Sequence, residues 1–409
     1  MTEIRRLTAG EIPQLEKIHT VVYNKRTEFP KDDGEGKDAE DDGRSGHPPS
    51  WAWGAFEKGK LLSCMWEIDF LMSFDGGNVK MSGVGGVGTL PEARRGGLVR
   101  RVFERLLPEA YENGAVFSNL TPFSHDYYRM FGYENACARN NISIPAKEFF
   151  DLKPGGEYVQ VFPGDDTSDL ARVHSAYIAG LNHGICRDYW PDNRGWREFT
   201  ENDPYSTGIY LYLWKDDDGE PRGYIKYEDE DDGEEGHAMA VKEIAFTDRK
   251  GLYGALGLVG GLSAQFRNFR WAMPTFIDPC DFIGNSWDVD QHINPREMTR
   301  VINVRAALER MRRPAGPPGE YVVEVEDADI AANSGRFLVE FAPGETGVSP
   351  TKRAADLRCD VRVLSQLVIG YRTLGNALLS RRSGLELCGN RETLERVFTL
   401  RPQHVTEYF

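Results

Sequence analysis

Residues 84–99 combine a glycine-rich strand with a basic turn that should open a helix. The strand, VGGVGTL at residues 84–90, carries three glycines among its first five residues. Glycine weakens a strand unless the strand must bend or another group must approach its backbone closely. We therefore expect the strand to bulge and to splay from its neighbour, which leaves part of its backbone open.

The turn after this strand, ARRGGLV at residues 93–99, places two glycines directly before the helix. The first turn of a helix leaves about four backbone N–H groups unpaired and carries the positive end of the helix dipole. Gly96 and Gly97 would let a phosphate approach those N–H groups. Four arginines could add positive charge at the rim of this turn: Arg94, Arg95, Arg100 and Arg101. The segment predicts a ligand that bears phosphates.

Glycine-rich turns of this kind also serve dinucleotide-binding and P-loop proteins, but the spacings of those motifs are missing here. No GxGxxG opens a helix with an acid downstream, and no GxxxxGK is followed by Ser or Thr. A basic helix start that binds nothing is the remaining alternative.

The surrounding residues predict a mixed α/β unit that positions this segment and ends near Asp151. Apolar residues between turn sequences indicate strands, and apolar residues spaced by three or four indicate helices. The expected strands are residues 51–56, 61–70, 79–90, 115–119 and 142–144. The expected helices are residues 8–24, 97–112 and 124–131.

Two further units are expected, because 409 residues exceed one ordinary core. The second, residues 152–293, repeats the order of elements of the first, with helices at 167–179, 190–199 and 253–266 and strands at 209–214, 223–227 and 239–246. The third, residues 294–409, has strands at 321–325, 336–341 and 357–363 and helices at 364–379 and 391–397. It carries no recognisable nucleotide motif.

Composition and charge argue against several classes of function. A net charge of −15 disfavours nonspecific binding to nucleic acid, whose phosphates require a basic face, and suits a cationic substrate better. No apolar run approaches the roughly 20 residues of a membrane span, and the N-terminus lacks the apolar region of a signal peptide. We therefore expect a cytoplasmic protein that binds neither nucleic acid nor a membrane.

Disulfides and metal centres are not expected either. The six cysteines are scattered singly, without CxxC pairs or a histidine at metal spacing. Four lone histidines are expected to be surface or packed residues rather than ligands: His19, His174, His183 and His292.

The pattern Arg94-x-x-Gly97-x-Val99 after a bulged strand resembles the acetyl-CoA pyrophosphate loop of the GNAT superfamily of acetyltransferases. The order of elements over the whole chain is similar to the enhanced-intracellular-survival (Eis) group of that superfamily. Its members have an N-terminal GNAT domain, a second GNAT-like domain without a cofactor site and a C-terminal domain similar to sterol carrier proteins. The resemblance implies an α+β fold of tandem GNAT domains, the second degenerate, with domains at residues 1–151, 152–293 and 294–409.

The resemblance also implies a set of residues that contact acetyl-CoA, the cosubstrate. The backbone of Val87 and Thr89 would pair with the pantetheine amides. The full set is Val87, Gly88, Thr89, Arg94, Arg95, Gly96, Gly97, Leu98 and Val99. The sequence departs from relatives at Phe123, where some have a serine that contacts the cofactor, and at Gly86, where an aromatic pocket residue would stand. We therefore expect a wider and differently shaped substrate pocket.

Tyr128 stands four residues before the pair Gly132-Tyr133, a spacing at which GNAT enzymes often place a tyrosine that faces the thioester sulfur. A phenol with a pKa near 10 is protonated at neutral pH and can give its proton to the departing CoA thiolate. The resemblance thus identifies Tyr128 as the general acid. The alternative is that Tyr128 packs on the helix and Gly132 only caps it.

The second unit looks degenerate in the same loop. TDRKGLYG at residues 247–254 lacks the R-x-x-G-x-V spacing, and Asp248 places a negative charge near where a phosphate would bind. We therefore expect one acetyl-CoA site per chain.

In the Eis group the C-terminal carboxylate reaches the site of the first domain and takes the proton of the amine. Here this base would be the α-carboxylate of Phe409, anchored by the aromatic pair Tyr408-Phe409. A frayed tail is the alternative. Relatives form hexamers, which implies that this chain is a homo-oligomer.

These features predict an acetyl-CoA-dependent N-acetyltransferase that acts on primary amines by direct transfer. The acceptor would be a small-molecule amine or a lysine side chain. The alternative is a catalytically weak acyl-CoA-binding or lipid-binding protein that uses the C-terminal domain. Such a carrier should show an uninterrupted apolar lining near its C-terminus, and the helix at residues 364–379 does not establish one by itself.

Overall fold

The computed structural model describes residues 2–23, 50–233, 236–312, 314–342, 345–382 and 384–407. The chain divides into two compact units. Unit 1 is drawn from Met1–Ala136 and Glu297–Arg401, together with Glu407, and unit 2 from Cys137–Arg296 and Pro402–Thr406. The described residues form three mixed sheets with flanking helices, which confirms the mixed α+β fold class.

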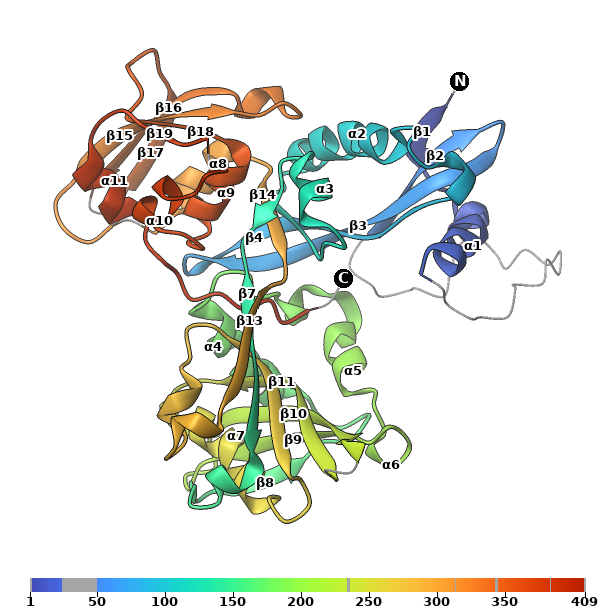
Figure 1. Cartoon of the computed structure of the whole chain (residues 1–409), viewed down its shortest axis with the longest axis vertical. Helices are drawn as coiled ribbons and strands as arrows, with labels where there is room; N and C mark the ends of the chain where they lie inside the picture. The colour runs from blue at the N-terminus through green and yellow to red at the C-terminus, as the bar shows by residue number, and fades with distance from the viewer. Residues whose placement is uncertain are drawn as a thin grey trace. The chain divides into compact units, whose positions relative to one another are not determined.

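The first sheet of unit 1 has the strand order β1-β2-β3-β4-β5-β14-β6 (Figure 1). Its strands are β1 (Glu3–Arg6), β2 (Ser50–Glu57), β3 (Lys60–Phe74), β4 (Gly77–Thr89), β5 (Phe117–Leu120), β14 (Met298–Val301) and β6 (Glu134–Asn135). β4 and β5 run parallel, and all other neighbours in this sheet run antiparallel. The helices of this region are α1 (Ile12–Val22), α2 (Leu98–Glu112) and α3 (His125–Arg129).

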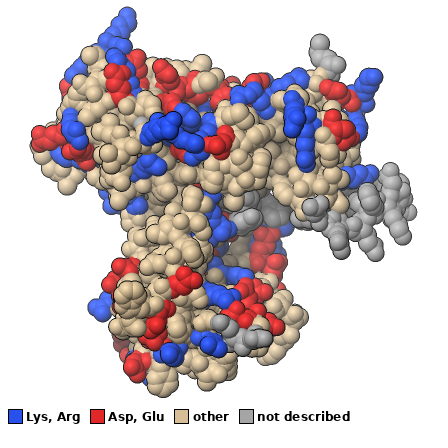
Figure 2. Space-filling model, viewed as in Figure 1, with Lys and Arg blue, Asp and Glu red and all other residues tan. Residues whose placement is uncertain are grey.

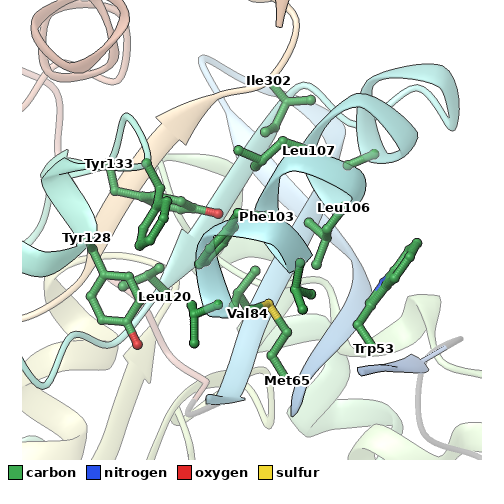
Figure 3. Close-up of a cluster of buried hydrophobic side chains, with 14 of the residues drawn as sticks. Trp53, Met65, Val84, Phe103, Leu106, Leu107, Leu120, Tyr128, Tyr133 and Ile302 are labelled. Carbon is green, nitrogen blue, oxygen red and sulfur yellow. The ribbon is translucent and has the colours of Figure 1, made fainter. Parts of the chain in front are cut away.

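Helix α2 packs on this sheet through an apolar stripe. Its buried residues are Leu98, Val99, Val102, Phe103, Leu106, Leu107 and Ala110. Figure 3 shows Phe103 and Leu106 in one cluster with Val84 and Met65 of the sheet. Burying a side chain of this size contributes about 1.5–3 kcal/mol to stability. The stripe therefore fixes the start of α2 next to β4.

The second sheet of unit 1 has the strand order β17-β16-β15-β18-β19. Its strands are β15 (Gly319–Glu326), β16 (Gly335–Ala342), β17 (Glu345–Pro350), β18 (Leu357–Asp360) and β19 (Glu386–Leu387). The helices that accompany it are α8 (Val304–Arg310), α9 (Val361–Val368), α10 (Leu374–Leu378) and α11 (Arg391–Val397).

Two elements expected here were wrong in extent. The strand expected at residues 357–363 ends at Asp360, because the Asp360 carboxylate accepts a hydrogen bond of 3.1 Å from the Val363 N–H and starts α9. The helix expected at residues 364–379 is interrupted at Gly370, which has a φ of +78°. A Cβ at this position would overlap Arg401, so the break requires glycine.

Unit 2 contains a sheet with the strand order β13-β7-β12-β11-β10-β9-β8. Its strands are β7 (Ala138–Pro145), β8 (Glu157–Gln160), β9 (Ile209–Lys215), β10 (Pro221–Asp231), β11 (His237–Phe246), β12 (Asn268–Pro274) and β13 (Asp290–Pro295). Its helices are α4 (Ser168–Ala179), α5 (Arg194–Thr200), α6 (Pro204–Thr207) and α7 (Arg249–Gly261). β11 and β12 run parallel, as β4 and β5 do in unit 1.

Two strands lie in a different sheet from the one that their position in the sequence suggests. The strand at residues 142–144, expected to end the first unit, was placed wrongly, because it belongs to β7 and pairs with β12 and β13 in unit 2. Ile142 and Ile144 are buried there with Phe269. β14, which the sequence analysis missed, pairs instead with β5 in unit 1. A local apolar pattern predicts a strand but not its sheet, and the domain boundaries stay predictions.

Candidate active site

Strand β4 bulges where it leaves β5. The parallel pairing of the two strands ends at Val84, whereas β4 continues beside β3 to Thr89. The register of β3 and β4 shifts within this stretch, where Gly86 has a φ of +56°. A Cβ at residue 86 would lie 2.8 Å from the rings of His19 and Trp66. The expected bulge is present, and it requires glycine at this position.

The turn between β4 and α2 leaves backbone N–H groups open. Arg95 has a φ of +66°, and Gly97, the N-cap residue of α2, has a φ of +71°. Turns that alternate left-handed and right-handed residues form concave nests of N–H groups that bind anions. In the described part of the chain, nothing accepts a hydrogen bond from the N–H of Gly96, Gly97, Leu98 or Val99. A Cβ at residue 97 would meet no described atom within 4 Å, so the space before the turn is open.

The four arginines expected at the rim of this turn have different partners. Arg94 and Arg95 are exposed, and Nε of Arg94 donates to the Thr89 carbonyl at 3.3 Å. Arg100 and Arg101 donate instead to main-chain carbonyl groups elsewhere in unit 1, at 3.2 and 2.9 Å. Arg100 is exposed too, but Arg94 and Arg95 are the two exposed arginines within the turn itself.

Carbonyl groups of the bulged segment accept hydrogen bonds from side chains. The Val87 carbonyl accepts from the Tyr23 hydroxyl at 3.1 Å, and the Gly88 carbonyl accepts from the Ser63 hydroxyl at 2.9 Å. Gly88 is also closely packed, because a Cβ there would lie 2.8 Å from the Ile18 side chain. The segment expected to hold the pantetheine arm is therefore rigid, and its contact with that arm stays a prediction.

Tyr128 lies at the margin of the core cluster to which α2 contributes. It belongs to α3, whose N-cap residue Ser124 accepts a hydrogen bond from the Tyr127 N–H. The side chain is buried, and Figure 3 shows its hydroxyl directed away from Phe103 and Leu107. No residue in the described ranges hydrogen bonds to that hydroxyl. The phenol is thus held by packing while its polar end is unpaired.

Burial decides the acid–base character of Tyr128. Desolvation raises the pKa of its hydroxyl above the ordinary value of 10, and the neighbouring Tyr23, Tyr127 and Tyr133 raise it further. The hydroxyl is therefore protonated at neutral pH and can donate a proton. Tyr23 also connects this residue to the bulge, since its own hydroxyl donates to the Val87 carbonyl. Tyr128 and the bulged end of β4 share one neighbourhood.

The packing alternative for this segment is also visible in the structure. Gly132 has a φ of +78°, and its N–H donates to the Arg129 carbonyl at 3.2 Å, so it closes the turn after α3. Tyr133 is buried with its hydroxyl 2.6 Å from that of Ser118. Packing and proton transfer are compatible roles for Tyr128, and the catalytic role stays a prediction.

Two side chains lie beside the bulge: His19, which the sequence analysis expected to be a surface or packed residue, and Tyr23, which it did not name. Nε2 of His19 lies 2.7 Å from the Gly86 carbonyl oxygen, and its ring lies 5.5 Å from that of Tyr23. Tyr23 is the C-cap residue of α1, and its spacing of four residues from His19 places both side chains on one side of the end of the helix. Phe123, expected to change the pocket, is 73% exposed and has its ring 5.4 Å from that of Tyr128.

The corresponding turn of unit 2 is closed. Asp248 precedes α7, and its carboxylate accepts a hydrogen bond of 2.9 Å from the Gly251 N–H. The same carboxylate pairs with Arg222 at 3.2 Å. Beyond the last pair of β11 with β12, Glu243 forms a buried ion pair of 2.6 Å with Arg187. The carboxylate of Asp248 thus caps the N–H of Gly251, and charged side chains lie at this helix start and on the strand before it.

Phe409, the predicted base, lies outside the described residues. The chain shortly before it is held within unit 2. Gln403 forms a parallel bridge with Asn182, and the His404 ring lies within hydrogen-bonding distance of the Tyr177 hydroxyl, at 2.8 Å. These contacts exclude a frayed tail for this stretch.

The described ranges contain neither a cluster of metal ligands nor a membrane-spanning helix. No three His, Cys, Asp or Glu side chains cluster there as metal ligands would. No helix in the described ranges is long and apolar enough to cross a bilayer. Figure 2 shows Lys and Arg intermingled with Asp and Glu over the face that it draws.

Comparison with known families and structures agrees with this architecture. Two family models, each described as an acetyltransferase (GNAT) domain, match residues 3–136 and 189–301, and a sterol carrier protein domain matches residues 304–406. An uncharacterized N-acetyltransferase of Streptomyces griseus is 23% identical over 379 residues, which cover 84% of this chain and 86% of the relative.

Solved structures show the same fold over the whole chain. A GCN5-related N-acetyltransferase from Anabaena variabilis has a TM-score of 0.83 at 19% identity, and both chains are covered fully. Eis1 from Mycobacterium abscessus has a TM-score of 0.76 at 20% identity, again over both full chains. The chain is therefore an acetyltransferase with two GNAT domains and a C-terminal sterol carrier protein domain, and its fold is similar to that of Eis1.

Proposed function

We propose that this enzyme transfers the acetyl group of acetyl-CoA directly to a primary amine. The observation that carries the proposal is the open start of α2 at Gly97, which follows a bulged strand and shares a core cluster with Tyr128. An anion site beside a protonated phenol is what a reaction with a phosphate-bearing thioester and a thiolate leaving group requires.

The start of α2 fits the pyrophosphate of acetyl-CoA. The N–H groups of residues 96–99 are open, and the space before Gly97 is clear of described atoms. The exposed guanidinium groups of Arg94 and Arg95 supply positive charge beside these N–H groups. Bound acetyl-CoA would supply the thioester whose acetyl group is transferred.

Tyr128 acts in this proposal as the proton donor to the leaving sulfur. Its proton stays on Oη at neutral pH, because the pKa of an ordinary phenol is near 10 and burial raises that of Tyr128 further, and its unpaired hydroxyl has no competing acceptor among the described residues. Positioned proton transfer of this kind contributes about 100-fold to 10,000-fold in rate. No covalent enzyme intermediate is needed.

The α-carboxylate of Phe409 is the proposed base for the amine. His404 is hydrogen bonded to Tyr177, and the five residues from 404 to 409 extend over at most about 17 Å. The net charge of −15 favours a cationic acceptor, either a small-molecule amine or a lysine side chain.

An assay of free thiol release from acetyl-CoA across a panel of amines tests the proposal. Tyr128→Phe removes one hydroxyl and should lower kcat by about 100-fold. Tyr127→Phe is the matched control, because it removes the adjacent, half-buried hydroxyl and should leave kcat unchanged. Two glycines added after Phe409 should displace the carboxylate by about 7 Å and lower kcat strongly.

Each part of the proposal has its own contrary result. If no amine raises thiol release above acetyl-CoA hydrolysis, the activity is wrong. Equal losses in Tyr128→Phe and Tyr127→Phe would remove the assignment of the acid. Full activity of the extended chain would show that the terminal carboxylate is not the base.

A further inference from the structure

A buried arginine holds the turn that follows Tyr128. Arg300 of β14 donates from Nη1 to the Phe131 carbonyl at 3.0 Å and from Nη2 to Asp327 at 2.7 Å. The side chains of Arg300 and Asp327 are both 0% exposed. Gly132 makes this approach possible, because a Cβ there would overlap the guanidinium group. The Gly-aromatic pair thus accommodates an arginine as well as ending α3.

The turn after Tyr128 depends on such external contacts. α3 spans only five residues, and a helix this short is not stable by itself. The N–H groups of Phe131 and Tyr133 both donate to the Tyr128 carbonyl, at 3.0 and 3.3 Å. Because Arg300 binds the carbonyl of Phe131, a shift of Arg300 would pass to the backbone of Tyr128 through a single residue.

Asp327, the partner of Arg300, is itself held rigidly. Its carboxylate accepts main-chain hydrogen bonds from Asp329 at 3.0 Å and Ile330 at 3.2 Å, and one from the Asn333 side chain at 2.8 Å. Asp327 lies within residues 304–406, the part of the chain that matches the sterol carrier protein domain. A domain distinct from the one that carries Tyr128 therefore fixes Arg300.

The same C-terminal domain touches this segment at both ends. Nε2 of Gln366 in α9 donates to the Asn135 carbonyl at 2.7 Å, after the turn. Arg382 pairs with Asp126 at 2.8 Å, at the start of α3. Tyr128 lies between these two contacts, and the Arg300 contact lies between it and Asn135.

We infer that the sterol carrier protein domain positions Tyr128 for proton transfer through Asp327 and Arg300. The inference rests on the proposed role of Tyr128 as the acid. Arg300 and Asp327 are positioning residues, because they act on the backbone of the turn and not on the reacting atoms. A function for the C-terminal domain follows that needs no bound lipid.

The experiment compares two buried aspartates in the full-length enzyme. Asp327→Asn removes the nearer of the two carboxylates that face Arg300, the other being Asp329 at 3.6 Å, while keeping the shape of the side chain. Asp216→Asn in unit 2 is the matched control, since Asp216 has a side chain that is 1% exposed and accepts hydrogen bonds from Arg222 and from two main-chain N–H groups. Both variants are assayed for thermal stability, kcat, KM for acetyl-CoA and amide hydrogen exchange of residues 124–133.

Asp327→Asn should lower kcat by about 10-fold to 100-fold, because a displacement of about 1 Å in a catalytic group costs up to about 100-fold. KM for acetyl-CoA should stay unchanged, and exchange in residues 124–133 should become faster. Asp216→Asn should lower thermal stability without changing kcat or that exchange. If Asp327→Asn does not fold, Gln366→Ala removes a milder contact with the same segment and should lower kcat by about 2-fold to 10-fold.

A double variant separates this inference from the proposed function. Adding Asp327→Asn to Tyr128→Phe should cause no further loss of kcat, because both changes remove the same contribution. Multiplied losses would overturn positioning through Tyr128. Wild-type exchange and kcat in both Asp327→Asn and Gln366→Ala would overturn the inference altogether. If Tyr128→Phe alone retains wild-type kcat, the proposed acid fails, while the exchange measurement still decides whether Asp327 holds the turn.

Discussion

In both units a pair of parallel strands separates, and a helix follows the first strand of the pair. The two helices differ in how their first turn is capped. In unit 1 the N-cap residue of α2 is Gly97, and nothing described lies within 4 Å of where its Cβ would be. In unit 2 the N-cap residue of α7 is Asp248, whose carboxylate accepts a hydrogen bond from the N–H of Gly251. The same topology thus yields an uncapped helix start in one unit and a self-capped helix in the other.

The strands before these helices differ in the same way. Two residues beyond the last parallel pair of β4 stands Gly86, with its left-handed φ of +56°. Two residues beyond the last parallel pair of β11 stands Glu243, buried against Arg187. At the first position the glycine backbone is packed against the rings of His19 and Trp66, whereas the second position is filled by an ion pair.

The glycines of α7 and the glycine at the start of α2 serve different purposes. α7 carries four glycines on one stripe: Gly251, Gly254, Gly257 and Gly260. A Cβ at residue 251 or 260 would overlap main-chain oxygen, and one at residue 254 would overlap Trp214. These glycines serve close packing, whereas Gly97 faces open space. Glycine content alone therefore does not mark a ligand site.

The largest expected effect comes from breaking the buried ion pair between Glu243 and Arg187 in unit 2. Glu243→Gln should lower the free energy of unfolding by about 3–5 kcal/mol, because it leaves Arg187 buried without its counter-charge. Denaturant titration of the variant and the wild type measures this loss. KM for acetyl-CoA should not change, since we do not expect the cosubstrate to bind near Glu243 in unit 2. A rise in KM as large as the stability loss would contradict the comparison.

The same pair predicts an acid-dependent loss of stability. Burial alone would raise the pKa of Glu243, but the charge and hydrogen bonds of Arg187 lower it from 4.5 to about 2. Because the folded value is the lower one, this contribution, about 3 kcal/mol, is present above about pH 4.5 and is lost as the pH falls toward 2. Unfolding free energies measured from about pH 6 to pH 3 should fall more steeply in the wild type than in Glu243→Gln. Parallel curves would contradict this assignment.

The next largest effect comes from placing an aspartate at the N-cap of α2, as in α7 of unit 2. Gly97→Asp places a carboxylate at the N-cap of α2 and should raise KM for acetyl-CoA by about 1,000-fold, because like charges about 4 Å apart repel by roughly 4 kcal/mol at an effective dielectric constant of 20. Gly97→Asn is the matched control, since asparagine tolerates the left-handed backbone without adding charge. Equal effects of the two substitutions would point to strain rather than charge.

A smaller effect concerns the exposed arginine of the turn. Arg94→Ala should raise KM for acetyl-CoA by about 10-fold and change kcat little, because a charge-assisted hydrogen bond to phosphate contributes roughly 1.5–3 kcal/mol before solvent screening. Arg105→Ala removes an exposed arginine from α2, the helix that follows the turn, and should have no effect. The difference between the two variants should shrink as salt is raised. A salt-independent difference would argue against phosphate binding.

The smallest effect tests the self-capped helix. Asp248→Ala should lower the unfolding free energy by about 1 kcal/mol, since it removes the N-cap of α7, and Asp248→Ser should restore most of it. Thermal unfolding at constant pH measures both. A loss in Asp248→Ser as large as that in Asp248→Ala would show that the cap is not the reason.

Local patterns in the sequence predicted much of the architecture. The apolar stripe of α2 and the glycines of β4 were visible because both effects act within a few residues. The sheet that β7 joins was not predictable, because pairing with β12 depends on contacts between residues more than a hundred positions apart. The same holds for β14, which pairs with β5 across a similar separation.

The residues of the candidate site also fall into those that local sequence identifies and those that depend on long-range contacts. Tyr128 and the turn at Gly97 were identified from spacing, whereas His19 and Tyr23 reach β4 from another element. Arg300 was missed altogether, since its partners lie in segments far from it in sequence. Side chains that act through long-range contacts leave no local signal.

The most direct test of the account is calorimetric titration of the chain with acetyl-CoA. We expect one bound acetyl-CoA per chain, no detectable binding to Gly97→Asp at the same concentrations, and one bound acetyl-CoA for Asp248→Ala. Two sites per wild-type chain, or unchanged binding to Gly97→Asp, would contradict the claim that the open start of α2 is the cosubstrate site and that unit 2 has lost its own.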